Sequence, residues 1–179
     1  MIRKINHYLA CAVALLLVVH AFMALLIVLG LSTFSFYQLP KILFVLVVLH
    51  GILGVISTLP ALRSGLRTGK WYIVQNKEYW IKRFSGIAIA LLLLFHTSAY
   101  LVVVNGTYFL QEFTFLRMAS QILFLLAIFI HLGVSVKSTL IAQGTLRLKN
   151  RSFDFMLLLS VITLILAGGI IAYYIQWQF

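Results

Sequence analysis

The sequence predicts an all-α integral membrane protein with five transmembrane helices, the first four of which form a pseudo-two-fold bundle. Of its 179 residues, 63% are hydrophobic and only 9% are charged, a composition that excludes an ordinary soluble domain. Spanning the hydrocarbon takes about 20 apolar residues in a helix, and the period-2 alternation of a membrane barrel is absent. Five apolar runs have the required length: residues 8–31, 41–62, 84–105, 117–136 and 154–176.

An internal repeat supports the pseudo-symmetry. Ala12–His20 recurs as Ala88–His96, a shift of 76 positions, and His50–Ala61 recurs as His131–Ala142, a shift of 81. Because alternate helices run in opposite directions, corresponding helices of the two repeats run the same way, and the repeat axis lies along the membrane normal.

We therefore expect one integral membrane domain, residues 1–179. It comprises a first helix pair at about 8–62, a second at about 84–143 and an additional helix at about 154–176.

The termini of the runs carry ordinary helix signals. The first run follows Arg3 and Lys4 but is too long for the apolar region of a secretory signal, so we keep it as a mature helix. The second begins near Pro40, a favourable first-turn residue, and is expected to end near residues 60–62. The third is expected to end at the turn signal Asn105-Gly106.

The fourth run carries His131. The fifth begins near Ser152 and Asp154, a plausible helix start, and Gly168-Gly169 would let it pack closely on a neighbour. It contains no histidine, so we interpret it as structural.

The net charge of +11 is explained by topology, so we expect no nucleic-acid partner. Alternate connections hold twelve of the fourteen cations, whereas the opposite side holds only Lys41 and Arg117. By the positive-inside rule the N-terminus is cytoplasmic and the C-terminus lies outside. The expected location is a bacterial cytoplasmic membrane, with membrane lipid as one partner. The twelve cations are Arg3, Lys4, Arg63, Arg67, Lys70, Lys77, Lys82, Arg83, Lys137, Arg147, Lys149 and Arg151.

Cys11 is the only cysteine, and no Cys-x-x-Cys-His motif occurs. A disulfide and a covalently attached c-type haem are therefore both excluded. His7 lies at the entry to the first helix, and we interpret it as an interfacial residue.

One histidine stands within each of the first four apolar runs: His20, His50, His96 and His131. An ionisable group inside a bilayer is costly and is a functional candidate by default. The repeat axis places each histidine opposite its repeat partner at a similar depth. Two facing neutral imidazoles can ligate haem iron, so we predict two haem b groups, held by His20/His96 and His50/His131. The latter is expected nearer the cytoplasm, because His131 lies six residues from Lys137.

Other residues are candidates because of their place in the predicted topology. Cations near the cytoplasmic ends could pair with haem propionates, and glycines beside the ligands could give a porphyrin room. Outer aromatic and acidic residues could contact a quinone. The propionate candidates are Lys137, Arg83, Lys82 and Arg63; the glycines are Gly51, Gly54 and Gly133; the quinone candidates are Tyr37, Tyr100, Tyr108 and Glu112.

The chain resembles the single-subunit, di-haem cytochrome b membrane anchor of the succinate dehydrogenase and fumarate reductase family. The resemblance rests on Trp80–Gly86 leading into the helix of His96, on His131–Lys137, and on one histidine in each of the first four helices. It implies electron transfer between a membrane quinone, menaquinone or ubiquinone, and cytoplasmic iron–sulfur and flavoprotein subunits. The dehydrogenase site would lie in those partners, and a homodimer of complexes is left open.

Two departures and two alternatives accompany this interpretation. The chain is short for that family, and its apolar runs contain no acid beyond Asp154 at the very start of the fifth, so proton-coupled chemistry is not expected. The first alternative is the cytochrome b subunit of a hydrogenase, a formate dehydrogenase or a b561-like reductase. The second is a haem-free transporter or assembly protein with structural histidines, which the near-absence of acidic and amide residues in the helices argues against.

Overall fold

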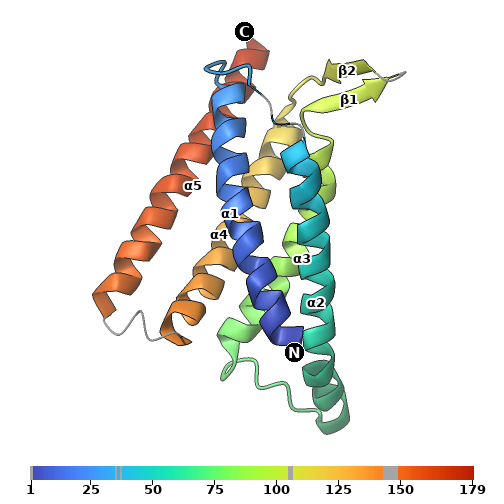
Figure 1. Ribbon diagram of the computed structural model, residues 1–179, viewed down its shortest axis with the longest axis vertical. Helices are drawn as coiled ribbons and strands as arrows, with labels where there is room; N and C mark the ends of the chain where they lie inside the picture. Colours follow the sequence, from blue (N-terminus) through green and yellow to red (C-terminus); the bar gives the residue numbers. More distant parts are fainter. Residues whose placement is uncertain (1, 35, 37, 105–106, 143–148) are drawn as a thin grey trace. The chain divides into compact units, whose positions relative to one another are not determined.

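The structure, a computed structural model, describes residues 2–34, 36, 38–104, 107–142 and 149–179, with the backbone alone at 101–109 and 137–152 within these ranges. Its described part contains five helices and one two-stranded hairpin (Figure 1). The elements are α1 (Ile2–Val28), α2 (Gln38–Thr68), α3 (Lys77–Thr97), β1 (Leu101–Val104), β2 (Thr107–Leu110), α4 (Phe115–Ala142) and α5 (Lys149–Gln178).

All five helices are long and apolar enough to cross a membrane, which confirms the predicted helical, membrane-spanning character. In the most apolar part of each helix, the share of buried residues runs from 0% in α1 to 22% in α4. Large apolar side chains such as Val18, Leu91 and Leu164 are instead exposed. Exposed side chains of this kind are favourable in contact with lipid and unfavourable in contact with water, as expected for helices embedded in a bilayer.

The chain divides into two compact units, Met1–Lys77 and Glu78–Phe179. The first unit contains the first repeat, and α1 packs against α2 within it. Helix α1 ends in a Schellman motif. Leu31 N donates to Leu26 O at 2.8 Å, Gly30 N donates to Ile27 O at 3.0 Å, and Gly30 takes the left-handed φ of 70° that this cap requires.

The expected end of the second helix near residues 60–62 is wrong, because α2 continues through Pro60 to Thr68. A proline lacks one backbone donor but does not always end a helix. The helix ends instead at Gly69, whose N–H still bonds Gly65 O at 2.9 Å and whose φ of 66° turns the chain away.

The second unit contains α3, the hairpin, α4 and α5. The expected continuation of the third helix to residue 105 is also wrong, because α3 ends at Thr97 and residues 101–104 form β1. The strands pair antiparallel from Leu101 opposite Leu110 to Val104 opposite Thr107. The turn signal at Asn105-Gly106 lies outside the described residues, but this register leaves a two-residue connection there. Three successive valines favour strand over helix.

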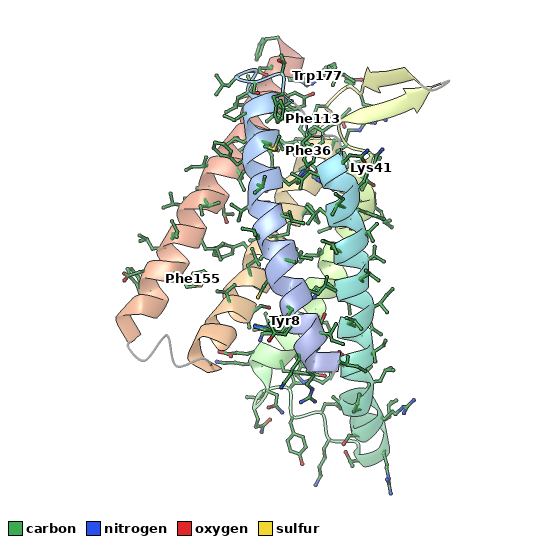
Figure 2. The ribbon with its side chains drawn as sticks, in the orientation of Figure 1. Tyr8, Phe36, Lys41, Phe113, Phe155 and Trp177 are labelled. Atoms are coloured by element: carbon green, nitrogen blue, oxygen red, sulfur yellow. The ribbon has the colours of Figure 1, made fainter. Side chains whose placement is uncertain are left out.

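Helices α4 and α5 pack together. Gly133 of α4 is buried, and a β-carbon there would lie 3.4 Å from the Met156 side chain of α5. At one end of this unit the ring of Phe113 is fully buried and packs 5.0 Å from Tyr173. Figure 2 shows Phe113 and Trp177 near this end.

Candidate functional site

The four repeated histidines lie on four different helices: His20 on α1, His50 on α2, His96 on α3 and His131 on α4. Each is partly buried. His96 was expected well inside its helix, but it lies in the last turn of α3, since that helix ends at Thr97. Each predicted haem pair takes one histidine from each unit, and the pairing stays a prediction.

His96 is held by a chain of hydrogen bonds from α4. Its Nδ1 lies 2.7 Å from Oε1 of Gln121, a side chain that is only 2% exposed. The amide nitrogen of Gln121 lies 3.1 Å from Ser120 Oγ. The Ser120 hydroxyl lies 2.7 Å from the backbone carbonyl of Arg117.

This chain assigns the protons. A carbonyl only accepts, so the Ser120 hydroxyl donates to Arg117 O, and Ser120 Oγ must accept from the Gln121 amide. The Gln121 Oε1 therefore faces His96, and the hydrogen bond forms only if Nδ1 of His96 carries the proton. In the neutral ring, Nε2 then carries the lone pair, which is the form that ligates a metal.

His131 is held in a similar way from α3. Its Nδ1 lies 3.1 Å from Ser85 Oγ, and the Ser85 hydroxyl donates to Ile81 O at 2.7 Å. Because that hydroxyl proton is already used, Ser85 Oγ accepts from His131 Nδ1. The neutral His131 ring is thereby also left with its lone pair on Nε2.

The two bonds lie at different levels of the antiparallel α3 and α4 pair. One joins His96 to Gln121 and the other joins Ser85 to His131. On α4, Gln121 and His131 are ten residues apart, and this spacing separates the levels of the two histidines. At 1.5 Å per residue this is about 15 Å along the helix. One metal ion cannot bind both imidazoles over that distance.

Gln121 and Ser85 were not identified from the sequence. An amide side chain in an otherwise apolar span is unusual, and this was one signal by which Gln121 could have been identified. A second signal was spacing, because Gln121 precedes His131 by ten residues and Ser85 precedes His96 by eleven, which matches two antiparallel helices in register. Ser85 alone resembles many helical serines that bond their own backbone.

Aromatic rings surround His96. The ring of Phe124 stacks on it with centroids 4.8 Å apart, and the ring of Tyr100 lies edge-on at 6.2 Å. On the His131 side, a β-carbon added to Gly86 would lie 3.6 Å from Cε1 of His131, so the α3 backbone passes close to that ring. These contacts and the Nδ1 bonds restrict both imidazoles.

The propionate candidates lie at helix ends. Lys82 and Arg83 are partly buried in the first turns of α3, and the Arg83 guanidinium lies 4.9 Å from the ring centroid of Tyr79. Arg63 is exposed near the end of α2. The side chain of Lys137 lies outside the described residues, although its backbone belongs to α4.

The three candidate glycines differ in their surroundings. Gly51, next to His50, has no atom within 4 Å of an added β-carbon. The carbonyl of Gly54 accepts from Ser57 and Thr58 at 2.8 and 2.7 Å. The space beside Gly133 is taken by Met156, as described above, so that glycine serves the packing of α4 on α5.

Of the quinone candidates, Tyr100 is the best defined. It stacks 5.2 Å from Phe113, and burial together with the neighbouring phenol of Tyr173 raises the pKa of Tyr100 to about 12. Glu112 is exposed, and its backbone carbonyl accepts from Arg117. Tyr37 and the side chain of Tyr108 lie outside the described residues.

No group of three or more His, Cys, Asp or Glu side chains that could hold a metal ion occurs among the described residues. Comparison of the chain with protein-family models, with curated proteins and with solved structures found no match.

Proposed function

We propose that this chain is a di-haem b membrane-anchor subunit that transfers electrons between a membrane quinone and a cytoplasmic iron–sulfur and flavoprotein partner. The observation that carries the proposal is the hydrogen bonding of His96 and His131. A histidine that ligates a metal usually donates its other ring N–H to an oxygen acceptor, which fixes the tautomer and the ring orientation. Both histidines of the second unit have such an acceptor at Nδ1.

The donor set fits haem. A haem b group would be held by neutral imidazole nitrogens of the protein, here those of His96 and His131 with their predicted partners. The separation of about 15 Å along α4 supports placing His96 and His131 in two different haem sites. The proposed partners are His20 for His96 and His50 for His131. Haem would supply reversible one-electron chemistry when bound, while the protein orients the imidazoles.

The remaining parts of the proposal rest on charge and position. The basic residues of the predicted cytoplasmic connections would face the soluble partner. The aromatic rings of Tyr100, Phe113 and Tyr173, which pack together beyond the end of α3, are a candidate wall for a quinone ring. Glu112, which directly precedes Phe113 in the sequence, is exposed.

A pyridine haemochrome assay on purified protein tests the proposal. We expect about two haem b per chain, with low-spin spectra in both oxidation states. His96→Ala and His131→Ala should each remove one haem and leave the other. If protein produced with ample haem carries none, the proposal is wrong, and the two Nδ1 hydrogen bonds then only satisfy buried histidines in a packing role.

A further inference from the structure

The segment Arg63–Lys77, the end of α2 and the turn that follows it, combines exposed cations with exposed apolar side chains. It contains four cations, Arg63, Arg67, Lys70 and Lys77, and no acid. Apolar side chains stand among these cations and are strongly exposed: Leu66 at 76% and Val74 at 82%. We call this segment the basic turn.

The basic turn begins where the apolar part of α2 stops. From Lys41 to Arg63 the helix rises about 33 Å, which matches a hydrocarbon thickness of about 30 Å. The last helical residues, up to Thr68, therefore extend past the apolar layer. Since α3 begins at Lys77 and also has membrane-spanning character, the basic turn is tied to the bilayer at both of its ends.

The chain then folds back along α2. A β-carbon added to Gly65 would lie 2.6 to 2.9 Å from three ring atoms of Trp71, so the indole rests directly on the backbone of Gly65. This contact brings Trp71 to within about one helical turn of Arg63, the first charge beyond the apolar part of α2. Tryptophan is enriched at this depth of a membrane.

The turn beyond Trp71 is built in a costly conformation. Tyr72 has a φ of 46°, a region that residues with a β-carbon rarely adopt. Asn76 N donates to Tyr72 O at 2.9 Å and closes the turn. Strain of this kind persists where the surroundings require the conformation. Its result here is that Tyr72, Ile73 and Val74 are all exposed.

We infer that the basic turn binds the anionic phospholipid headgroups of the membrane that the chain spans. Its cations complement lipid phosphates, and a cluster of cations directly beside a membrane helix attracts anionic lipid. Its exposed apolar side chains suit the boundary between headgroups and acyl chains. A water-soluble partner would use the same charges, but it would not account for the return of Trp71 to the level of Gly65. The inference does not depend on haem.

Fluorescence quenching of Trp71 tests the inference. A variant carrying Trp80→Phe and Trp177→Phe leaves Trp71 as the only tryptophan. This full-length protein is placed in nanodiscs of phosphatidylcholine and phosphatidylglycerol, with bromine on the upper acyl chain of one lipid or the other. One unscreened cation at the membrane surface favours an anionic lipid over a neutral one by roughly fivefold. We therefore expect brominated phosphatidylglycerol to quench at least about threefold more per mole than brominated phosphatidylcholine.

Two charge variants of this protein complete the experiment. Arg67→Gln with Lys70→Gln should reduce the quenching ratio to about one, whereas Arg3→Gln with Lys4→Gln removes equal charge from the start of α1 and should leave the ratio unchanged. All four cations are exposed, so neither double variant should unfold the protein. Equal quenching by both lipids, an equal fall in both double variants, or no quenching by either lipid would overturn the inference. The last result would indicate a protein-docking surface instead.

Discussion

Replacing Gln121 by leucine is the sharpest test of the proposal that His96 is a metal ligand. The change keeps the approximate size of the side chain but removes the acceptor that lies 2.7 Å from His96 Nδ1. Gln121 is only 2% exposed, so water does not easily replace its carbonyl. The Nδ1 proton of His96 would then be left inside the protein without this acceptor.

The expected size of the effect follows from that lost acceptor. Leaving a buried donor unsatisfied costs about 1–3 kcal/mol, and about 1.4 kcal/mol corresponds to a factor of ten in affinity. The site at His96 should therefore bind haem about 5- to 150-fold more weakly. Outer partners of metal ligands typically change metal affinity by about 10–100-fold, which agrees with this range.

The assay is a titration of haem-depleted protein with haem, followed by the low-spin absorbance of each site. The Gln121→Leu protein should fill one site as the unaltered protein does and the other only at higher haem concentration. Gln121→Glu retains a carboxyl acceptor and should restore binding. Gln176→Leu makes the same chemical change at an exposed position of α5 and should have no effect. Unchanged binding in Gln121→Leu would refute the role given to the Gln121 hydrogen bond.

Three further predictions follow from the same structure. Ser85→Ala should weaken haem binding at His131, but less than Gln121→Leu weakens it at His96, because the Ser85–His131 hydrogen bond is longer, at 3.1 Å. The same titration measures this difference. Tyr100 has a pKa raised from 10.0 to about 12, so the folded protein holds the phenol proton more tightly than the unfolded chain does. Stability should fall as the pH rises from 10 to about 12, and Tyr100→Phe should reduce this fall in a pH series of thermal unfolding in detergent. Gly65→Ala should displace the indole of Trp71 and change its emission in the single-tryptophan protein, whereas Gly51→Ala, with no atom within 4 Å, should leave the emission unchanged.

The sequence was sufficient to predict the five membrane-spanning helices, because apolar length is a strong signal when about 20 residues are needed to cross the hydrocarbon. It was not sufficient to predict two helix ends. Pro60 indicated an end to α2, yet the helix continues to Thr68. In the other case, Asn105-Gly106 is a common hairpin turn, but the three valines before it continue the apolar run of the third helix and were assigned to that helix.

The histidines could be identified from their repetition, whereas their hydrogen-bond partners could not. The repeat aligns Gln121 with Pro40 and Ser85 with Leu9, so a search for repeated polar residues misses both partners. Which serine or amide meets a histidine depends on the register of α3 against α4, and no single helix contains that information.

The repeat does not extend to the hydrogen bonds of the histidines. Neither proline nor leucine has a polar side chain, so whatever contacts His20 and His50 make, those contacts are not copies of the two bonds in the second unit. A ligand fixed in one tautomer and one orientation loses less freedom when it binds a metal. Both histidines of the second unit are therefore oriented before any metal binds. It follows that Gln121→Leu should affect only the site of His96 and leave the site of His131 unchanged, since the two bonds lie about 15 Å apart along α4 and share no residue.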